Sequence, residues 1–244
     1  MAFALSPVWV EVARHLIDEP WKLPVLAVPW LLWRLVARDG GTGPKGSEAG
    51  AGARRTGLIA IGLAVALELL TLGAGLPRWG RPALALAVFG WLRASGLAST
   101  PTAALAIFLV PVPSALSRAT DPALVDGWRS LAAAILPGVE RASFPLDLQH
   151  GDAGWAVAWL GAGMGVYAAR RLDWRPALLL PALSLGLIGG FVCQGLGVVL
   201  AAALSLPLGP ELGRAALLGA PLLLLLGLLL VALPRAARTQ EARP

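Results

Sequence analysis

The sequence predicts an all-α protein, a polytopic integral membrane bundle of about seven transmembrane helices with amphipathic interfacial helices beside them. Of the 244 residues, 57% are hydrophobic and only 14% are charged, and the apolar residues gather in long runs that short loops separate. A hydrocarbon core about 30 Å thick requires about 20 mostly apolar residues per helix. A water-facing fold is excluded, because no aqueous surface accommodates a run such as Leu222–Leu230.

Seven apolar runs are the candidate spans. Several have the length that a bilayer requires, whereas the first and fourth are short and contain prolines, so we expect these two to tilt or kink. No internal repeat is evident, and one helical domain should contain residues 1–244. The runs are Trp21–Val36, Gly57–Leu76, Pro82–Leu97, Thr100–Leu116, Ala153–Ala169, Pro176–Leu204 and Ala215–Leu233.

Basic residues give the expected topology. They cluster within Arg34–Arg55, Arg170–Arg175 and Arg235–Arg243, which share one side of the membrane if each run crosses once. Because basic loops stay in the cytoplasm, we expect an inner (plasma) membrane protein with its amino terminus outside and its carboxyl terminus in the cytoplasm. The formal charge of +6 has the same origin. Nucleic acid is not an expected partner, because no basic run alternates with stacking aromatic residues.

Three segments outside the runs have distinct compositions. Residues 1–20 contain an amphipathic stretch, Val8–Asp18, which predicts a helix lying on the outer surface. Residues 39–56 are rich in glycine and charge, which is typical of a flexible linker, here a cytoplasmic one. Residues 234–244 should form a cytoplasmic tail.

The longest outer loop, residues 117–152, is the expected partner-binding segment. Its apolar residues recur at helical spacing between Pro122 and Ile135, which predicts an amphipathic helix. We expect its apolar face to rest either on the lipid bilayer or on another membrane subunit. The residues of that face singled out for partner binding are Leu124, Trp128 and Leu131.

Three stretches follow one another in a characteristic order. Ser6–Arg38 joins an amphipathic stretch to a proline-bearing run that ends in tryptophan and arginine, and Ala104–Ala115 ends in a Pro-x-Pro turn. Trp128–Arg175 then contains an outer helix, an extended piece and a further helix. This order resembles the exosortase/archaeosortase family of membrane transpeptidases. The resemblance implies a helical membrane protein related to enzymes that process membrane-anchored sorting signals at the outer face.

The resemblance also locates the positions of the family's catalytic cysteine, arginine and histidine. Active members place Cys-Ser-Gly at the start of the fifth span, where this chain has Asp152-Ala153-Gly154, and the family's arginine corresponds to Gln194. No histidine follows His150. A carboxylate does not replace a thiolate nucleophile in acyl transfer without changing the chemistry. The resemblance therefore implies a degenerate member and favours a non-catalytic protein.

A few residues are further candidates for chemistry. His150 and Asp152 stand two residues apart at the outer end of the fifth span, where they would act as a general base or Asp152 would cap the helix. Cys193, the only cysteine, lies beside Gln194 and is either a packed thiol or a displaced nucleophile. Small residues within Gly186–Gly197 favour close helix packing. No metal or cofactor is expected, since only two histidines and no cofactor motif are present.

Glu68 and Arg93 lie within candidate spans. An ionisable side chain there usually faces the bundle interior, pairs with another group or lines a path. Arg93 is close enough to the end of its span to extend toward the interface. Glu68 lies deeper, where it would have an internal polar role or form a structural hydrogen bond to a neighbouring helix.

The sequence thus favours a scaffold or accessory subunit of a membrane complex, with the bilayer and other membrane subunits as partners. One alternative is an active exosortase-like transpeptidase or protease. The other is a small transporter or lipid-handling protein, which Glu68 and the proline-broken runs favour, although no internal symmetry supports it.

Overall fold

The computed structural model describes residues 27–39, 47–74, 80–110, 114–140, 144–148, 150–172 and 174–241, with side chains except at residues 38–39, 47–49, 80–81, 114–116, 150–151, 176 and 231–241. These described residues form eight α-helices and three short 3-10 helices, which confirms the all-α class. The chain divides into two compact units, Met1–Pro111 and Val112–Pro244. That residues 1–244 form a single domain stays a prediction.

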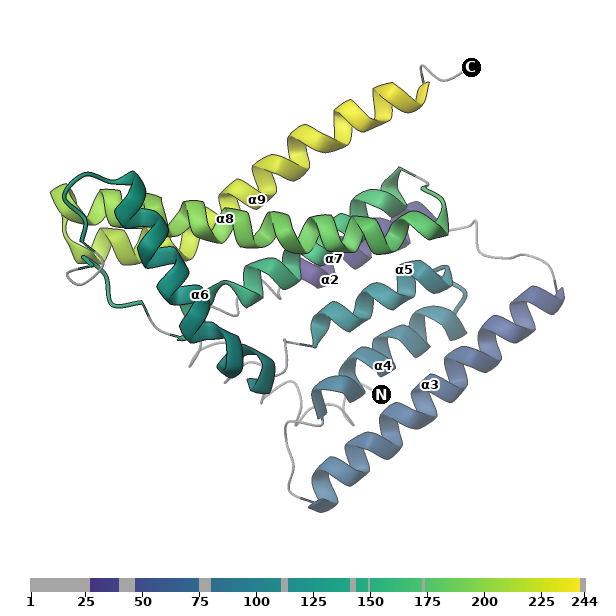
Figure 1. The fold of residues 1–244 in the computed structure, drawn as a ribbon. Coiled ribbons are helices and arrows are strands. Elements are labelled where there is room, and N and C mark those ends of the chain that lie inside the picture. Colours follow the sequence, from purple (N-terminus) through teal and green to yellow (C-terminus); the bar gives the residue numbers. More distant parts are fainter. Residues whose placement is uncertain are drawn as a thin grey trace. The chain divides into compact units, whose positions relative to one another are not determined.

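The first unit contains four α-helices within its described residues. These are α2 (Ala27–Asp39), α3 (Ser47–Ala74), α4 (Gly80–Ala94) and α5 (Thr100–Ala104), which continues as the 3-10 helix η3 (Leu105–Leu109). Helix α3 packs antiparallel to α4, and η3 packs on α4 and α2 (Figure 1). Helix α4 is therefore the centre of this unit.

Small residues allow α3 and α4 to pack closely. A Cβ atom on Gly57 would lie 2.6 Å from the backbone oxygen of Gly90, so the two backbones meet at this crossing. Further along, Ala64 forms a small core with Leu84 and Ala87. The opposite face of α3 exposes seven large apolar side chains, which are Leu58, Ile59, Leu63, Val65, Leu69, Leu70 and Leu72.

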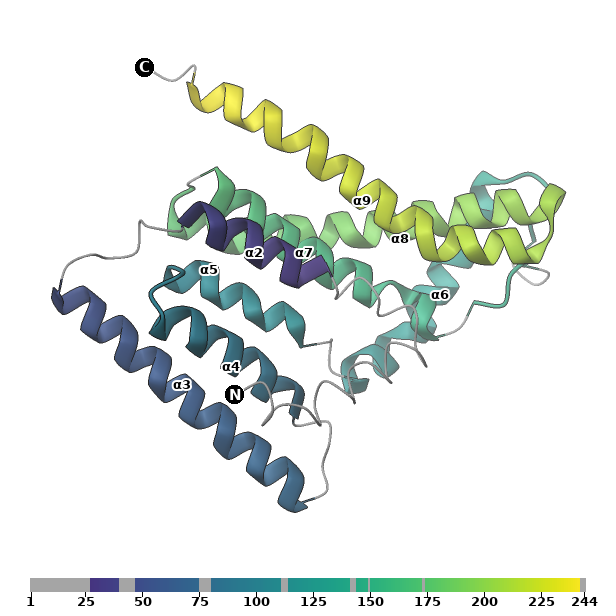
Figure 2. The ribbon, with the colours of Figure 1, turned by 180° about the vertical axis from the view of Figure 1, so that it is seen from behind.

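The second unit is built around a long central helix. It contains α6 (Ser114–Ile135), the 3-10 helix η4 (His150–Ala153), α7 (Trp155–Arg171), the 3-10 helix η5 (Pro176–Leu178), α8 (Leu179–Leu208) and α9 (Pro210–Glu241). Helix α8 packs against both α7 and α9, and α6 contacts η4 and α8. In both views the last turns of α9 diverge from α8 (Figures 1 and 2).

Three helices are long and apolar enough to cross a bilayer, judged by length and composition: Gly50–Ala74, Leu179–Leu208 and Pro210–Leu230. Their outer faces expose large apolar side chains, such as Leu180 at 71% and Leu223 at 70% of full exposure. Water disfavours this much exposed leucine, whereas lipid accommodates it. The chain is therefore a multi-pass membrane protein that contacts the lipid bilayer.

Each of the seven predicted runs contains helix, but the other four helices are short. Helix α4 has 15 residues and thus a length of about 22 Å, less than the hydrocarbon thickness of about 30 Å. The fourth run, Thr100–Leu116, is helical from Thr100 to Leu109, and its last three residues belong to the start of α6. Helix α7 is the most buried of the four within its unit, so packing explains its apolar run.

Three boundaries differ from those predicted. Helix α3 begins at Ser47, so the second half of the expected linker, residues 39–56, is helical. Its first turns pack through Ala53 against their unit, and packing of this kind overrides a composition typical of loops. Helix α6 begins eight residues before Pro122, and α9 extends to Glu241 through most of the expected tail. The predicted outer helix in residues 1–20 lies outside the described residues.

Candidate functional site

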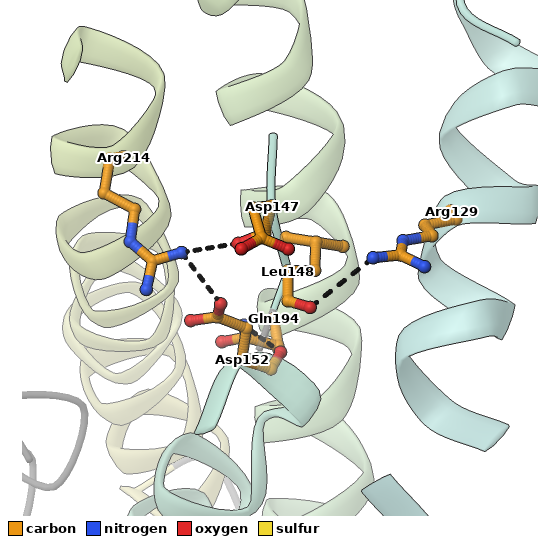
Figure 3. A network of polar contacts seen from close by, with 6 residues as sticks. All are labelled: Arg129, Asp147, Leu148, Asp152, Gln194 and Arg214. Carbon is orange, nitrogen blue, oxygen red and sulfur yellow. Dashed lines mark hydrogen bonds and ion pairs between the residues drawn. The ribbon is translucent and has the colours of Figure 1, made fainter. Parts of the chain in front are cut away.

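Asp152 and Gln194, which the resemblance predicts at catalytic positions, are adjacent in the second unit. The Nε2 atom of Gln194, on α8, donates a 2.8 Å hydrogen bond to the backbone oxygen of Asp152, in η4. Asp152 is 3% exposed and Gln194 is 4% exposed. Figure 3 shows the two residues together with the side chains around them. The amide of Gln194 thus has an acceptor in the interior, as a buried polar group requires.

The carboxylate of Asp152 forms an ion pair with Arg214, which lies near the start of α9. Arg214 Nη1 is 3.1 Å from Asp152 Oδ2 and also donates a 2.8 Å hydrogen bond to the backbone oxygen of Asp147 (Figure 3). The Arg214 side chain is 38% exposed. A buried carboxylate is costly unless it is paired, and Arg214 provides the paired cation.

Helix α6 holds the same segment from another direction. Trp128 Nε1 donates a 3.0 Å hydrogen bond to the backbone oxygen of Ala153, and Arg129 Nη2 lies 3.5 Å from that of Leu148. The segment between Asp147 and Ala153, here called the 147–153 segment, therefore accepts side-chain hydrogen bonds from α6, α8 and α9. Loops usually make few contacts with the rest of a protein, so these hydrogen bonds fix the position of the backbone that leads into α7.

Gly154 begins α7 in a conformation that favours glycine. Its φ is +98°, and a Cβ atom there would lie 2.5 Å from Gln194 Cγ. Gly154 is the N-cap residue, and no side-chain hydrogen bond caps this helix. The expectation that Asp152 caps the helix is therefore wrong. Asp152 precedes the N-cap residue by two positions, and its carboxylate pairs with Arg214.

The predicted partner-binding residues of α6 divide into two groups. Trp128 and Leu124 pack on a hydrophobic core that includes Leu148 and Val198. The Trp128 ring also touches Gly195, where an added Cβ would lie 2.7 Å from the ring. Leu131, by contrast, is exposed. Within this chain Trp128 and Leu124 are thus anchors of α6, and Leu131 is available to lipid or to another subunit.

The two remaining weak candidates of this unit are Cys193 and His150. Cys193 is a free thiol, 1% exposed, on the buried face of α8 beside Gln194. Burial on this scale excludes substrate from the sulfur atom unless the unit opens. His150 begins η4, but its side chain lies outside the described residues.

In the first unit, Glu68 and Arg93 have different environments. Arg93 Nη1 donates a 3.0 Å hydrogen bond to the backbone oxygen of Ala98, in the turn after α4. Arg93 therefore binds the turn that follows its own helix, and its extension toward the interface stays a prediction. Glu68, on α3, is 5% exposed, and its Oε2 atom has no hydrogen-bond partner among the described residues.

Sequence reasoning missed Arg214. A signal was present, because in the predicted topology Arg214 lies at the outer end of the last span, where arginine is unusual. An arginine at such a place needs a partner, and the partner is Asp152. The sequence did not indicate which acidic residue would be chosen.

The site as a whole holds backbone in place. Its donors are amide, indole and guanidinium groups, and most of their acceptors are backbone oxygens. No group of three or more His, Cys, Asp or Glu in the described ranges is arranged to hold a metal ion. Comparison with family models, curated proteins and solved structures gives no match for the chain.

Proposed function

We propose that this chain is a non-catalytic, exosortase-like membrane protein that acts as a scaffold or accessory subunit of a membrane complex. The observation that carries the proposal is the ion pair of Asp152 with Arg214, at the place that matches the family's nucleophile. A nucleophile or general base must reach its substrate. Asp152 is 3% exposed and already paired, so its role is structural.

Gln194 supports the same proposal. The family's arginine would act on substrate from this position, whereas Gln194 donates to the backbone of Asp152. The pair of positions that would cooperate in an active member therefore joins α8 to the start of α7. A scaffold needs such fixed joints, because a rigid surface costs less entropy to bind.

We place the chain in an inner (plasma) membrane, with the amino terminus outside, the carboxyl terminus in the cytoplasm and seven passes. The basic clusters support this orientation. The short helices α2, α4 and α5 with η3 are apolar, and packing against longer neighbours would let them share a locally thinned bilayer.

The proposed partner surface is the exposed apolar edge of α6. Leu131 is 38% exposed and Ile135 is 53% exposed, and both lie on a helix that is otherwise attached to η4 and α8. Other membrane subunits would contact these two side chains. Trp128, being packed inside the chain, would support the surface without belonging to it.

Co-purification from native membranes in mild detergent tests this function. The tagged full chain should retain another membrane protein, and Leu131→Ala with Ile135→Ala should reduce its amount several-fold without changing the abundance of the chain. Leu223→Ala, on the exposed face of α9, is the matched control and should leave retention unchanged. Purification of the chain alone, or equal loss in all variants, would refute the scaffold function. Cleavage of a membrane-anchored peptide by the purified chain would favour the enzyme instead.

A further inference from the structure

Glu68 lies on the face of α3 that packs within the first unit. Its neighbours on that face are Ala64, one turn before it, and Thr71, both buried. Ala64 contacts Leu84 and Ala87 of α4, so the face that contains Glu68 is directed at α4. Glu68 also lies inside Gly50–Ala74, a helix long and apolar enough to cross the membrane.

One oxygen of the Glu68 carboxyl lacks a hydrogen-bond donor among the described residues. Its Oε2 atom is buried and has no partner within the described part of the chain. Thr71 does not supply a proton, because its hydroxyl donates a 2.8 Å hydrogen bond to the backbone oxygen of Leu67 and carries a single hydrogen. The core cluster on this face of α3 consists of alanine and leucine side chains. An unpaired carboxylate in such a place costs far more free energy than the uncharged acid.

Among the described side chains of α3 and α4, the charged ones lie away from Glu68. Arg54 and Arg55 precede Glu68 by more than three turns of α3, a distance of about 20 Å along the helix. Arg93 lies near the far end of α4 and binds Ala98. Arg81 is in the first turn of α4, and its side chain lies outside the described residues. It is therefore the cation whose pairing with Glu68 an experiment has to test. The 3-10 helix η3, which also packs on α4, has no ionisable residue.

We propose that Glu68 is a proton-binding site within the membrane, held as the uncharged carboxylic acid between α3 and α4. The ligand of this site is a proton, and the site reacts with carbodiimides that dissolve in lipid. Exposed leucines before and after Glu68, Leu63 and Leu69 among them, place this helix in contact with the lipid from which such a reagent arrives. This inference goes beyond a scaffold function, because a scaffold requires no intramembrane acid.

Labelling of the full chain in native membranes with dicyclohexylcarbodiimide tests the site. This reagent adds to protonated carboxyl groups in apolar surroundings, and tandem mass spectrometry of the digested chain locates the adduct. We expect the adduct on Glu68 in the unmodified sequence and its loss in Glu68→Gln. Glu211→Gln removes an exposed acid at the start of α9 and should leave the adduct unchanged. A water-soluble carbodiimide with an added amine should modify exposed acids and spare Glu68.

Arg81→Gln distinguishes a protonated Glu68 from a Glu68 carboxylate that is paired with Arg81. If Glu68 holds a proton, this substitution leaves the extent of labelling at Glu68 unchanged. If Glu68 is instead a carboxylate paired with Arg81, the unmodified chain gives no adduct at Glu68 and Arg81→Gln produces one, and that result overturns the proposal. Infrared difference spectra give a second measurement, in which the carbonyl band of a protonated carboxyl should disappear in Glu68→Gln. Absence of that band from the folded, unmodified chain would equally overturn it.

Discussion

The side-chain amide of Gln194 and the backbone oxygen of Asp152 are joined by a 2.8 Å hydrogen bond across 42 residues of chain. The carboxylate of the same Asp152 is held by Arg214 of α9. One residue of a 3-10 turn thus connects α8, α9 and the start of α7. Removing Gln194 or Arg214 takes a hydrogen-bond donor away from the buried Asp152, and such a loss costs free energy in a protein interior.

Arg214→Met should lower the free energy of unfolding by about 1–3 kcal/mol, because it removes the cation that is paired with the buried Asp152 carboxylate. The exposure of the Arg214 side chain places the expected loss toward the lower end of this range. Asp152→Asn combined with Arg214→Met should cost less than the sum of the single changes. Arg175→Met, at an exposed position, is the control and should have little effect. Unfolding of the purified chain in micelles gives the values, and additive losses would contradict the coupling.

Gly154→Ala should destabilise the second unit through two separate effects. The positive φ of +98° costs an alanine about 1–2 kcal/mol, and the added Cβ would displace Gln194 from its bond to Asp152. Gly138→Ala separates the effects, since Gly138 has a φ of +83° with nothing within 4 Å of the added Cβ. The loss at Gly154 should exceed that at Gly138 by about 1 kcal/mol or more. Equal losses in thermal unfolding would show that the contact with Gln194 is unimportant.

The helical class and the order of helices follow from the sequence because apolar runs have few other solutions in a membrane. The close packing predicted for the small residues of Gly186–Gly197 is also confirmed, since a Cβ on Gly190 would lie 2.5 Å from the Cα of Ala158. Helix ends were harder to predict. The start of α3 at Ser47 depends on packing that composition does not encode, because the same residues are typical of a loop.

The candidate site was predicted only in part. Asp152 and Gln194 were singled out, and they do meet. Their partner Arg214 was not, because the contact joins residues 62 positions apart, and nothing local in the sequence indicates which acid an arginine at a helix start will choose. The capping hypothesis for Asp152 failed for a related reason. The amides at the start of α7 and the guanidinium of Arg214 are both possible partners of the Asp152 carboxylate. Tertiary geometry decides between them, and the carboxylate pairs with Arg214.

Cys193→Ala should leave abundance and complex formation nearly unchanged. The thiol is 1% exposed and packs on the buried face of α8, so its removal should cost about 1 kcal/mol, the scale of a small core truncation. Unfolding of the purified variant and retention of other subunits provide the measurements. Complete loss of function at normal protein level, or a thioester trapped on Cys193, would establish a catalytic thiol and refute the scaffold function.

Membrane topology can be measured with single cysteines placed in the Cys193→Ala background. Reporters at Glu48 and Gln240 should be shielded from an impermeant maleimide in intact cells, and one at Ser143 should react, because the basic clusters put the first two positions in the cytoplasm. All three should react in lysed cells, which serves as the control.

The reporter at Gln240 also decides how many helices cross the bilayer. With seven passes, six crossings separate Glu48 from Gln240, so both lie on one side of the membrane. If only the three long helices cross, three crossings separate them and Gln240 lies on the same side as Ser143. Joint labelling of Gln240 and Ser143 in intact cells, with Glu48 protected, would therefore replace the seven-pass topology by a three-pass one. In that case α2, α4 and α5 with η3 would lie along the interface or pack beside the spans. Helices of about 22 Å or less can do so because they need not cross the hydrocarbon core.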